Sequence, residues 1–134
     1  MTMALCYGGG VNSSALLIQM VQRGMRPDLI TFADVGAERR LTYQFLPMMD
    51  AYLRDHGFPP ITVCAYTPKP KTLAKYRAGV LDVIKRLGLT VDAIGIARLS
   101  RLYGNMVANR TLPGQAFNIK SCSFKWKLEA QEPT

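Results

Sequence analysis

Three short apolar segments alternate with three helical patterns in residues 3–87, and this alternation constrains the fold more than any other feature of the chain. Each apolar segment has the length of a strand and is closely followed by Gly, Asp or Pro. In the stretches between and after them, apolar residues recur every three or four positions, which is typical of helices. Repeated strand–helix pairs build a parallel sheet. We therefore expect one α/β domain over residues 1–134, a three-layer Rossmann-like parallel sheet with helices on both faces.

The expected strands are residues 3–7, 29–33 and 61–65, and the first is expected to be buried. The expected helices run from Ser13 to the Gly24 turn, over 39–56, and over 72–87 before Gly88. In the second helix, Pro47 should kink the helix or split it in two. The apolar residues of that helix should form one buried face, made of Leu41, Phe45, Met48, Met49, Tyr52 and Leu53.

Beyond Gly88 the patterns are weaker. Residues 90–97 have the composition of a fourth strand, and residues 98–109 that of a short helix interrupted by Gly104. Residues 110–120 are expected to form a loop, and residues 121–131 a helix start or a structured loop.

Composition limits the class of protein. Apolar residues make up 49% of the 134, enough for one core and against bulk disorder. No apolar run approaches the roughly 20 residues of a membrane span, and no signal-like segment opens the chain, so we expect no membrane partner. Three widely spaced cysteines fit a reducing cytoplasm better than a disulfide framework. Cys6 and Cys64 lie in apolar strands, where small core roles are expected.

Positive charge dominates the C-terminal part of the chain. The net charge is +8, and residues 85–127 carry eight Lys or Arg residues but one acid, Asp92. Such a bias suits the phosphates of a nucleotide or of a nucleic acid. A solvated basic surface is the alternative.

Gly8, Gly9 and Gly10 join the first expected strand to the first helix. In open parallel sheets, ligands bind at this end of the strands. Glycine leaves the amides accessible, and the helix N-terminus adds free N–H groups and a positive dipole end. Asn12, Ser13 and Ser14 add polar side chains. The pattern predicts an anion cradle suited to phosphate; a simple structural turn is the alternative.

The loop sequence GGGVNS, residues 8–13, resembles the SGGxDS phosphate loop of the PP-loop superfamily. Its central glycines and last serine match, whereas Gly8 and Asn12 replace a serine and an aspartate.

Two later segments resemble phosphoadenosine phosphosulfate (PAPS) reductases, especially the PAPS-reductase-like proteins of phages and bacteria. FADVGAERRLTY resembles their DTGxExPET segment, with matches at Asp34, Gly36, Glu38 and Thr42. KSCSFKWKLEAQ resembles their CCxxxKxxP segment, with Cys122 and Lys127 at the first cysteine and the lysine.

This resemblance implies an adenine nucleotide alpha-hydrolase-like fold that binds ATP or PAPS. It places Asp34, Gly36 and Glu38 near the base and ribose of the nucleotide. A helix-capping role is the alternative for Asp34, and the helix dipole alone would favour Glu38 in a first helical turn. Further anion contacts are expected from three lysines: Lys120, Lys125 and Lys127.

Cys122 is the candidate catalytic residue, because the lysines around it favour the nucleophilic thiolate. A structural role is the alternative. It has no CxxC partner, so we expect neither a metal nor an iron–sulfur cluster.

PAPS reductases attack sulfur with a cysteine in an ECGxH-like C-terminal tail, which thioredoxin or glutaredoxin then regenerates. No such motif precedes Thr134, so either the chain is shortened or it keeps the nucleotide pocket without the full chemistry. Nucleotide binding is therefore expected ahead of reduction. Two further hypotheses are an ATP pyrophosphatase that adenylates its substrate, and a non-catalytic basic module associated with nucleic acid.

Overall fold

Strands and helices alternate through the first half of the computed structural model, which describes residues 1–110, 115–116, 119–120, 127 and 129–131. The chain divides into two units, one formed by residues 1–33 and 38–64 and the other by residues 34–37 and 65–132.

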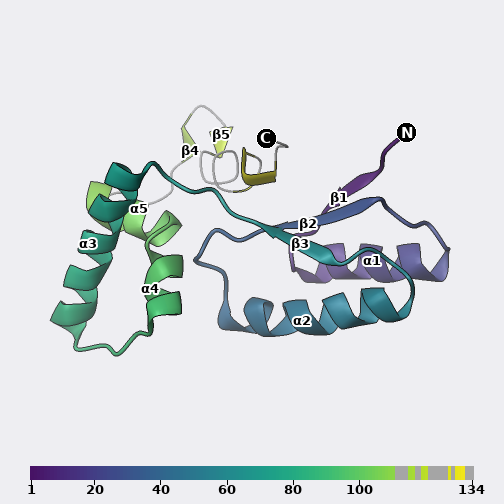
Figure 1. The fold of residues 1–134 in the computed structure, drawn as a ribbon, viewed down its shortest axis with the longest axis horizontal. Coiled ribbons are helices and arrows are strands. Elements are labelled where there is room, and N and C mark those ends of the chain that lie inside the picture. The colour runs from purple at the N-terminus through teal and green to yellow at the C-terminus, as the bar shows by residue number, and fades with distance from the viewer. Residues whose placement is uncertain (111–114, 117–118, 121–126, 128, 132–134) are drawn as a thin grey trace. The chain divides into compact units, whose positions relative to one another are not determined.

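The first unit is a parallel sheet with two helices (Figure 1). Its strands pair in the order β1-β2-β3, with Leu5 opposite Ile30 and Ile30 opposite Ile61. Both crossovers step in the same direction across the sheet, so their usual right-handedness places both helices on one face, as Figure 1 shows. The expected α/β class and its first five elements are thus confirmed. Their bounds are β1 Ala4–Cys6, α1 Val11–Gln22, β2 Leu29–Ala33, α2 Arg40–Asp55 and β3 Ile61–Cys64.

The core of the first unit lies between the sheet and its two helices. Ile30 and Phe32 of the central strand are fully buried there, because alternate residues of a strand point to the same face. The rest of this cluster comes from the strand ends and the helices: Tyr7, Leu17, Met20, Met49, Leu53 and Phe58. Burial of these side chains is the main force that holds α1 and α2 on the sheet.

The outer strands are less buried than β2. Cys6 is exposed, only Leu5 of β1 is half-buried, and Cys64 of β3 is half-buried. The expectation of a buried first strand is wrong, and a core role is wrong for Cys6. In this three-stranded sheet, only β2 has a neighbouring strand on each side.

Helix α2 departs from its pattern in one way. It continues through Pro47 as one helix, so of the two expected alternatives, a kink or a split, the split does not occur. Its apolar residues do not share one buried face. Met49 and Leu53 are buried, whereas Leu41 and Met48 are 75% and 67% exposed.

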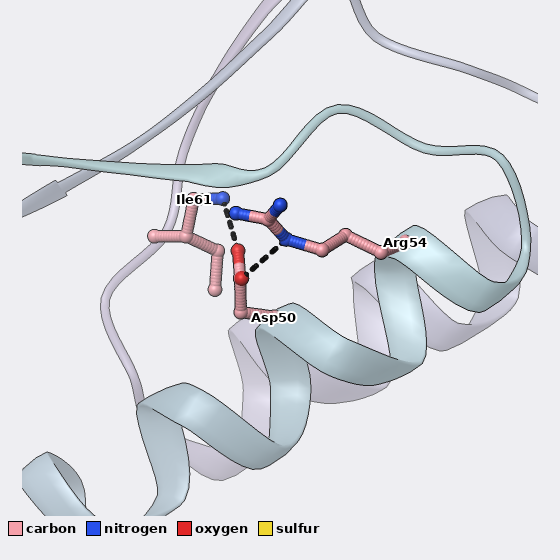
Figure 2. Close-up of polar contacts among 3 residues, drawn as sticks. All are labelled: Asp50, Arg54 and Ile61. Carbon is pink, nitrogen blue, oxygen red and sulfur yellow. Dashed lines mark hydrogen bonds and ion pairs between the residues drawn. The ribbon is translucent and has the colours of Figure 1, made fainter.

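Asp50 ties the middle of α2 to β3 (Figure 2). One carboxylate oxygen accepts the Ile61 backbone N–H at 2.7 Å, and the other accepts Arg54 Nε–H at 2.7 Å. Burial by itself would raise the pKa of Asp50, but the Ile61 amide and the Arg54 guanidinium outweigh it and hold that pKa below its usual value. This contact fixes where β3 begins.

In its described residues, the second unit has the helices α3 Pro70–Leu87, α4 Ala93–Leu99 and α5 Leu102–Asn109. It also contains the antiparallel pair β4 Gln115–Ala116 and β5 Ile119–Lys120, and a 3₁₀ turn, Glu129–Gln131. Helix α3 begins two residues before its expected start, with Pro70 in its first turn, where a missing N–H costs nothing. It ends at Gly88 as expected, with φ +64°.

Residues 90–97 do not form the expected fourth strand. Residues 93–97 belong to α4, because Asp92 caps that helix by accepting the Gly95 N–H at 2.7 Å. The expected interruption at Gly104 is also wrong, since α5 runs through it. A Cβ on Gly104 would lie 2.7 Å from Tyr76 Cβ, so this glycine lets α5 approach α3 closely.

The expected loop over 110–120 contains the β4–β5 pair, while most of the 121–131 segment lies outside the described residues. Among the helices that the structure describes, none is both long and apolar enough to span a bilayer.

Candidate functional site

The glycine loop follows β1, as the sequence predicts. The Tyr7 N–H donates to the Thr31 carbonyl at 2.7 Å, which continues the pairing of β1 with β2 by one residue. The chain then passes through Gly8, Gly9 and Gly10 and enters α1 at Val11. All of these residues lie in the first unit.

Gly9 is enclosed by residues of the FADVGAERRLTY segment, residues 32–43. Its φ is +69°, and a Cβ there would lie 2.8 Å from Thr42 Cγ2 and 3.2 Å from Phe32 Cε2. A side chain would therefore be strained and would also collide. The fold brings the glycine loop together with the FADVGAERRLTY segment at this point.

Gly10 is the N-cap of α1, and its surroundings are open. A Cβ on Gly10 would meet no atom within 4 Å, and no described side chain caps the helix. The first turn contains no acid, Val11 is 85% exposed, and Asn12 is exposed. The first N–H groups of a 12-residue helix are thus accessible and not neutralised. Amides in this position bind anions through hydrogen bonds and through the helix dipole.

The two serines organise the loop. Both hydroxyls donate to the Gly10 carbonyl, from Ser13 at 3.1 Å and from Ser14 at 2.8 Å. Ser14 is buried, and its Oγ lies 2.8 Å from the Tyr7 hydroxyl. Because Ser14 gives its proton to the carbonyl, Tyr7 is the donor in this pair. Ser14 therefore fixes the loop, whereas Ser13, which is half-buried, lies nearer the surface.

Tyr7 is the residue that sequence reasoning missed. Burial raises the pKa of its phenol. The signal in the sequence is the position of Tyr7 directly before the glycines. A tyrosine there can bury its ring in the core and still place its hydroxyl next to a polar group of the loop.

A groove of about 670 Å³ lies between the first halves of α1 and α2, beside the loop. Its walls are mostly apolar, which accounts for the exposure of Val11, Leu41 and Met48. Polar groups come from the loop and from three side chains, Ser14, Thr42 and Gln44. The groove suits an apolar or aromatic group rather than a bare anion.

Asp34 and Gly36 belong to the second unit. Asp34 is buried, one carboxylate oxygen accepts the Gly36 N–H at 2.8 Å, and the other lies 3.3 Å from Arg101 Nη1. The alternative of helix capping by Asp34 is wrong, because Arg39 is the N-cap of α2. Glu38 lies before that N-cap and is half-buried, so it is not a first-turn residue.

The candidates near the C-terminus are described only in part. Lys120 lies on β5, and Lys127 is exposed. Cys122 and Lys125 lie outside the described residues, so their predicted roles stay predictions.

No family model, curated protein or solved structure matches the chain. Its function must therefore be inferred from the loop, the groove and the charge.

Proposed function

We propose that this chain binds an adenine nucleotide, PAPS or ATP, with the anionic groups on the main-chain amides at the start of α1. The observation that carries this proposal is the open, uncapped N-terminus of α1 at Gly10. An anion there gains hydrogen bonds and the favourable end of the helix dipole. The net charge of +8 adds long-range attraction for a polyanion.

The apolar groove supports an adenosine-bearing ligand over inorganic phosphate alone. Its volume of about 670 Å³ lies within the range of small-molecule sites, roughly 300–1,000 Å³. Gly9, Gly10 and Ser14 line it at the end next to the free amides. A ligand with phosphates on the amides therefore has room for a base and sugar between α1 and α2.

The finer assignment, a PAPS-reductase-like domain with a three-layer sheet, rests on the resemblance of the three motifs. In that assignment Asp34, Gly36 and Glu38 face the base and ribose, and Lys120, Lys125 and Lys127 face phosphate or sulfate. Cys122 or an external thiol would attack the sulfur of PAPS and displace adenosine 3′,5′-bisphosphate, leaving an S-sulfonate. A thiol of thioredoxin or glutaredoxin would then attack the S-sulfonate, release sulfite and form a disulfide.

Calorimetric titration with ATP, AMP, PAPS, adenosine 3′,5′-bisphosphate and tripolyphosphate tests the binding proposal. At a hundred times its dissociation constant, a true ligand stabilises the fold by about 2.7 kcal/mol, which shifts Tm by about 10 °C for a chain of this size. Tripolyphosphate should bind more weakly than ATP, because it leaves the groove empty. Absence of binding by all four nucleotides would overturn the proposal.

Product analysis separates the possible chemistries. Sulfite release from PAPS in the presence of a dithiol supports the reductase assignment, and pyrophosphate release from ATP supports an adenylating enzyme. Binding of oligonucleotides that weakens steeply with salt, without nucleotide binding, supports the nucleic-acid module instead.

A further inference from the structure

A second cavity, of about 360 Å³, lies wholly within the second unit. The connection from β3 to α3, helix α3, helix α4 and the turn after α4 surround it. Small side chains on α4 leave the space open. The lining residues are Thr67, Pro68, Leu73, Arg77, Ala93, Ala97, Ser100 and Arg101.

Arg101 is held in place at this cavity. Its Nη1 lies 3.3 Å from the Asp34 carboxylate and 3.4 Å from the Asp34 carbonyl oxygen. Its side chain is only 27% exposed, so the guanidinium is partly withdrawn from water. These contacts use Nη1, and a guanidinium has further N–H donors on Nε and Nη2. Arg101 is therefore pre-positioned and still has donors for a ligand.

Arg77, from the middle of α3, supplies the second cation. Its side chain makes no hydrogen bond or ion pair with any residue that the structure describes. Arg77 is exposed, so its guanidinium at the wall of the cavity is paired with water rather than with a described acidic side chain.

The charge of Arg101 is already paired with Asp34, so Arg77 is the cation whose charge is left for a ligand. Among the residues that the structure describes, no acidic side chain lines the cavity. Ser100 Oγ donates its proton to the Ile96 carbonyl at 2.6 Å, so it has no proton left for a ligand. Asp92, next to Ala93, is engaged by the Gly95 amide. The cavity thus combines two guanidinium groups with apolar walls from Leu73, Pro68 and the alanines of α4.

We propose that this cavity binds a small phosphate or sulfate monoester, whose oxyanion pairs with Arg77 and Arg101 and whose organic group lies against Leu73 and Ala97. Planar guanidinium groups form paired, charge-assisted hydrogen bonds with such oxyanions. A bare inorganic ion would not fill the cavity, and it would leave the apolar walls without a contact. The proposal does not depend on the glycine loop, because none of the lining residues belongs to the first unit.

Calorimetric titration with phenyl phosphate, phenyl sulfate and inorganic phosphate tests this site. Phenyl phosphate should bind the unmodified chain saturably and more tightly than inorganic phosphate. Arg77→Gln should weaken that binding about 10- to 100-fold, the usual effect of losing charge-assisted hydrogen bonds. Arg77→Lys should give an intermediate affinity, because it keeps the charge and loses the planar fork.

Arg86→Gln is the matched control on the same helix, since Arg86 is exposed and pairs with Asp82 at 2.8 Å. Arg86→Gln should leave the affinity unchanged, and thermal unfolding of both glutamine variants should resemble that of the unmodified chain. Equal affinities for the Arg77→Gln and Arg86→Gln variants would overturn the proposal. So would equal affinities for phenyl phosphate and inorganic phosphate.

The variant Gly10→Asp separates this site from the glycine loop. Binding of phenyl phosphate that survives in Gly10→Asp and is lost in Arg77→Gln supports the proposal, even if nucleotide binding fails. Binding that is lost in Gly10→Asp and survives in Arg77→Gln would place the ester at the glycine loop and refute the second site. Comparison of the two aryl esters shows whether the site prefers phosphate or sulfate.

Discussion

Gly10→Asp should make the protein more stable and at the same time abolish nucleotide binding. Gly10 has φ −91° and ψ 173°, an extended conformation that any residue adopts, and a Cβ there meets no atom within 4 Å. Asp is among the best N-cap residues and improves on Gly by a few tenths of a kcal/mol. Its charge next to the α1 dipole adds about 0.3–1 kcal/mol. The total is about 0.5–1.5 kcal/mol, or about 2–5 °C in Tm for a chain of this size.

The same carboxylate should exclude the ligand. It accepts the N–H groups of the first turn, which are the groups assigned to phosphate. It also repels a phosphate group about 4–5 Å away, where two unit charges near a protein surface interact by about 3–4 kcal/mol. A loss of at least about 100-fold in nucleotide affinity is expected.

Two further substitutions at Gly10 separate charge from capping. Gly10→Asn caps α1 without charge, so it should lower affinity less than Asp does. Gly10→Ala neither caps nor repels, so it should keep most of the affinity and cost about 0.5–1 kcal/mol of stability. Calorimetry and thermal unfolding on the four proteins measure both quantities. If Gly10→Asp gains stability and still binds ATP or PAPS with unchanged affinity, the amides of α1 are not the anion site.

Three other substitutions test the fold around the candidate residues. Gly36→Ala should destabilise the protein by more than about 3 kcal/mol in chemical denaturation, because φ at Gly36 is +78° and a Cβ would collide with the Arg98 carbonyl oxygen. Tyr7→Phe should make the free energy of unfolding fall less steeply at alkaline pH. Burial raises the pKa of Tyr7 in the folded state, so the unmodified chain loses stability as pH rises above about 10. Asp50→Asn should lower the free energy of unfolding by about 1 kcal/mol at pH 7 and should make stability fall less steeply below about pH 4. The reason is that the Ile61 amide and Arg54 hold the folded-state pKa of Asp50 below its usual value against the effect of burial. A Tyr7→Phe curve parallel to that of the unmodified chain above pH 10, or an Asp50→Asn curve parallel to it below pH 4, would contradict the corresponding assignment.

The first half of the fold was predictable because local signals and long-range packing agree there. β2 was predicted with its observed bounds, since a short apolar run stopped by Asp34 leaves one interpretation. The glycine loop was placed correctly for the same reason. The enclosure of Gly9 by Phe32 and Thr42 was not predictable, because it depends on how α2 returns to the sheet.

The predictions for the second half of the chain are wrong where the same residues fit two kinds of local structure. In residues 90–97, apolar residues fit a strand or a short helix, and the cap from Asp92 to the Gly95 amide decides for the helix. Gly104 suggests a break, yet in α5 it is the residue that permits contact with Tyr76. Both outcomes depend on neighbours that a single sequence does not display.

The placement of polar groups around Gly10 supports the proposal of a binding loop over a structural turn. A turn that served only to start α1 would gain stability from a capping side chain at the N-cap. In this chain the serines stand three and four residues after Gly10, where their hydroxyls bond its carbonyl and leave the amides uncapped. The side chains that could satisfy the helix terminus are thus used to shape the loop. If the uncapped amides of α1 are the anion site, as we propose, a carboxylate at Gly10 stabilises the helix and excludes the ligand. The Gly10 substitutions should then have opposite effects on stability and on binding.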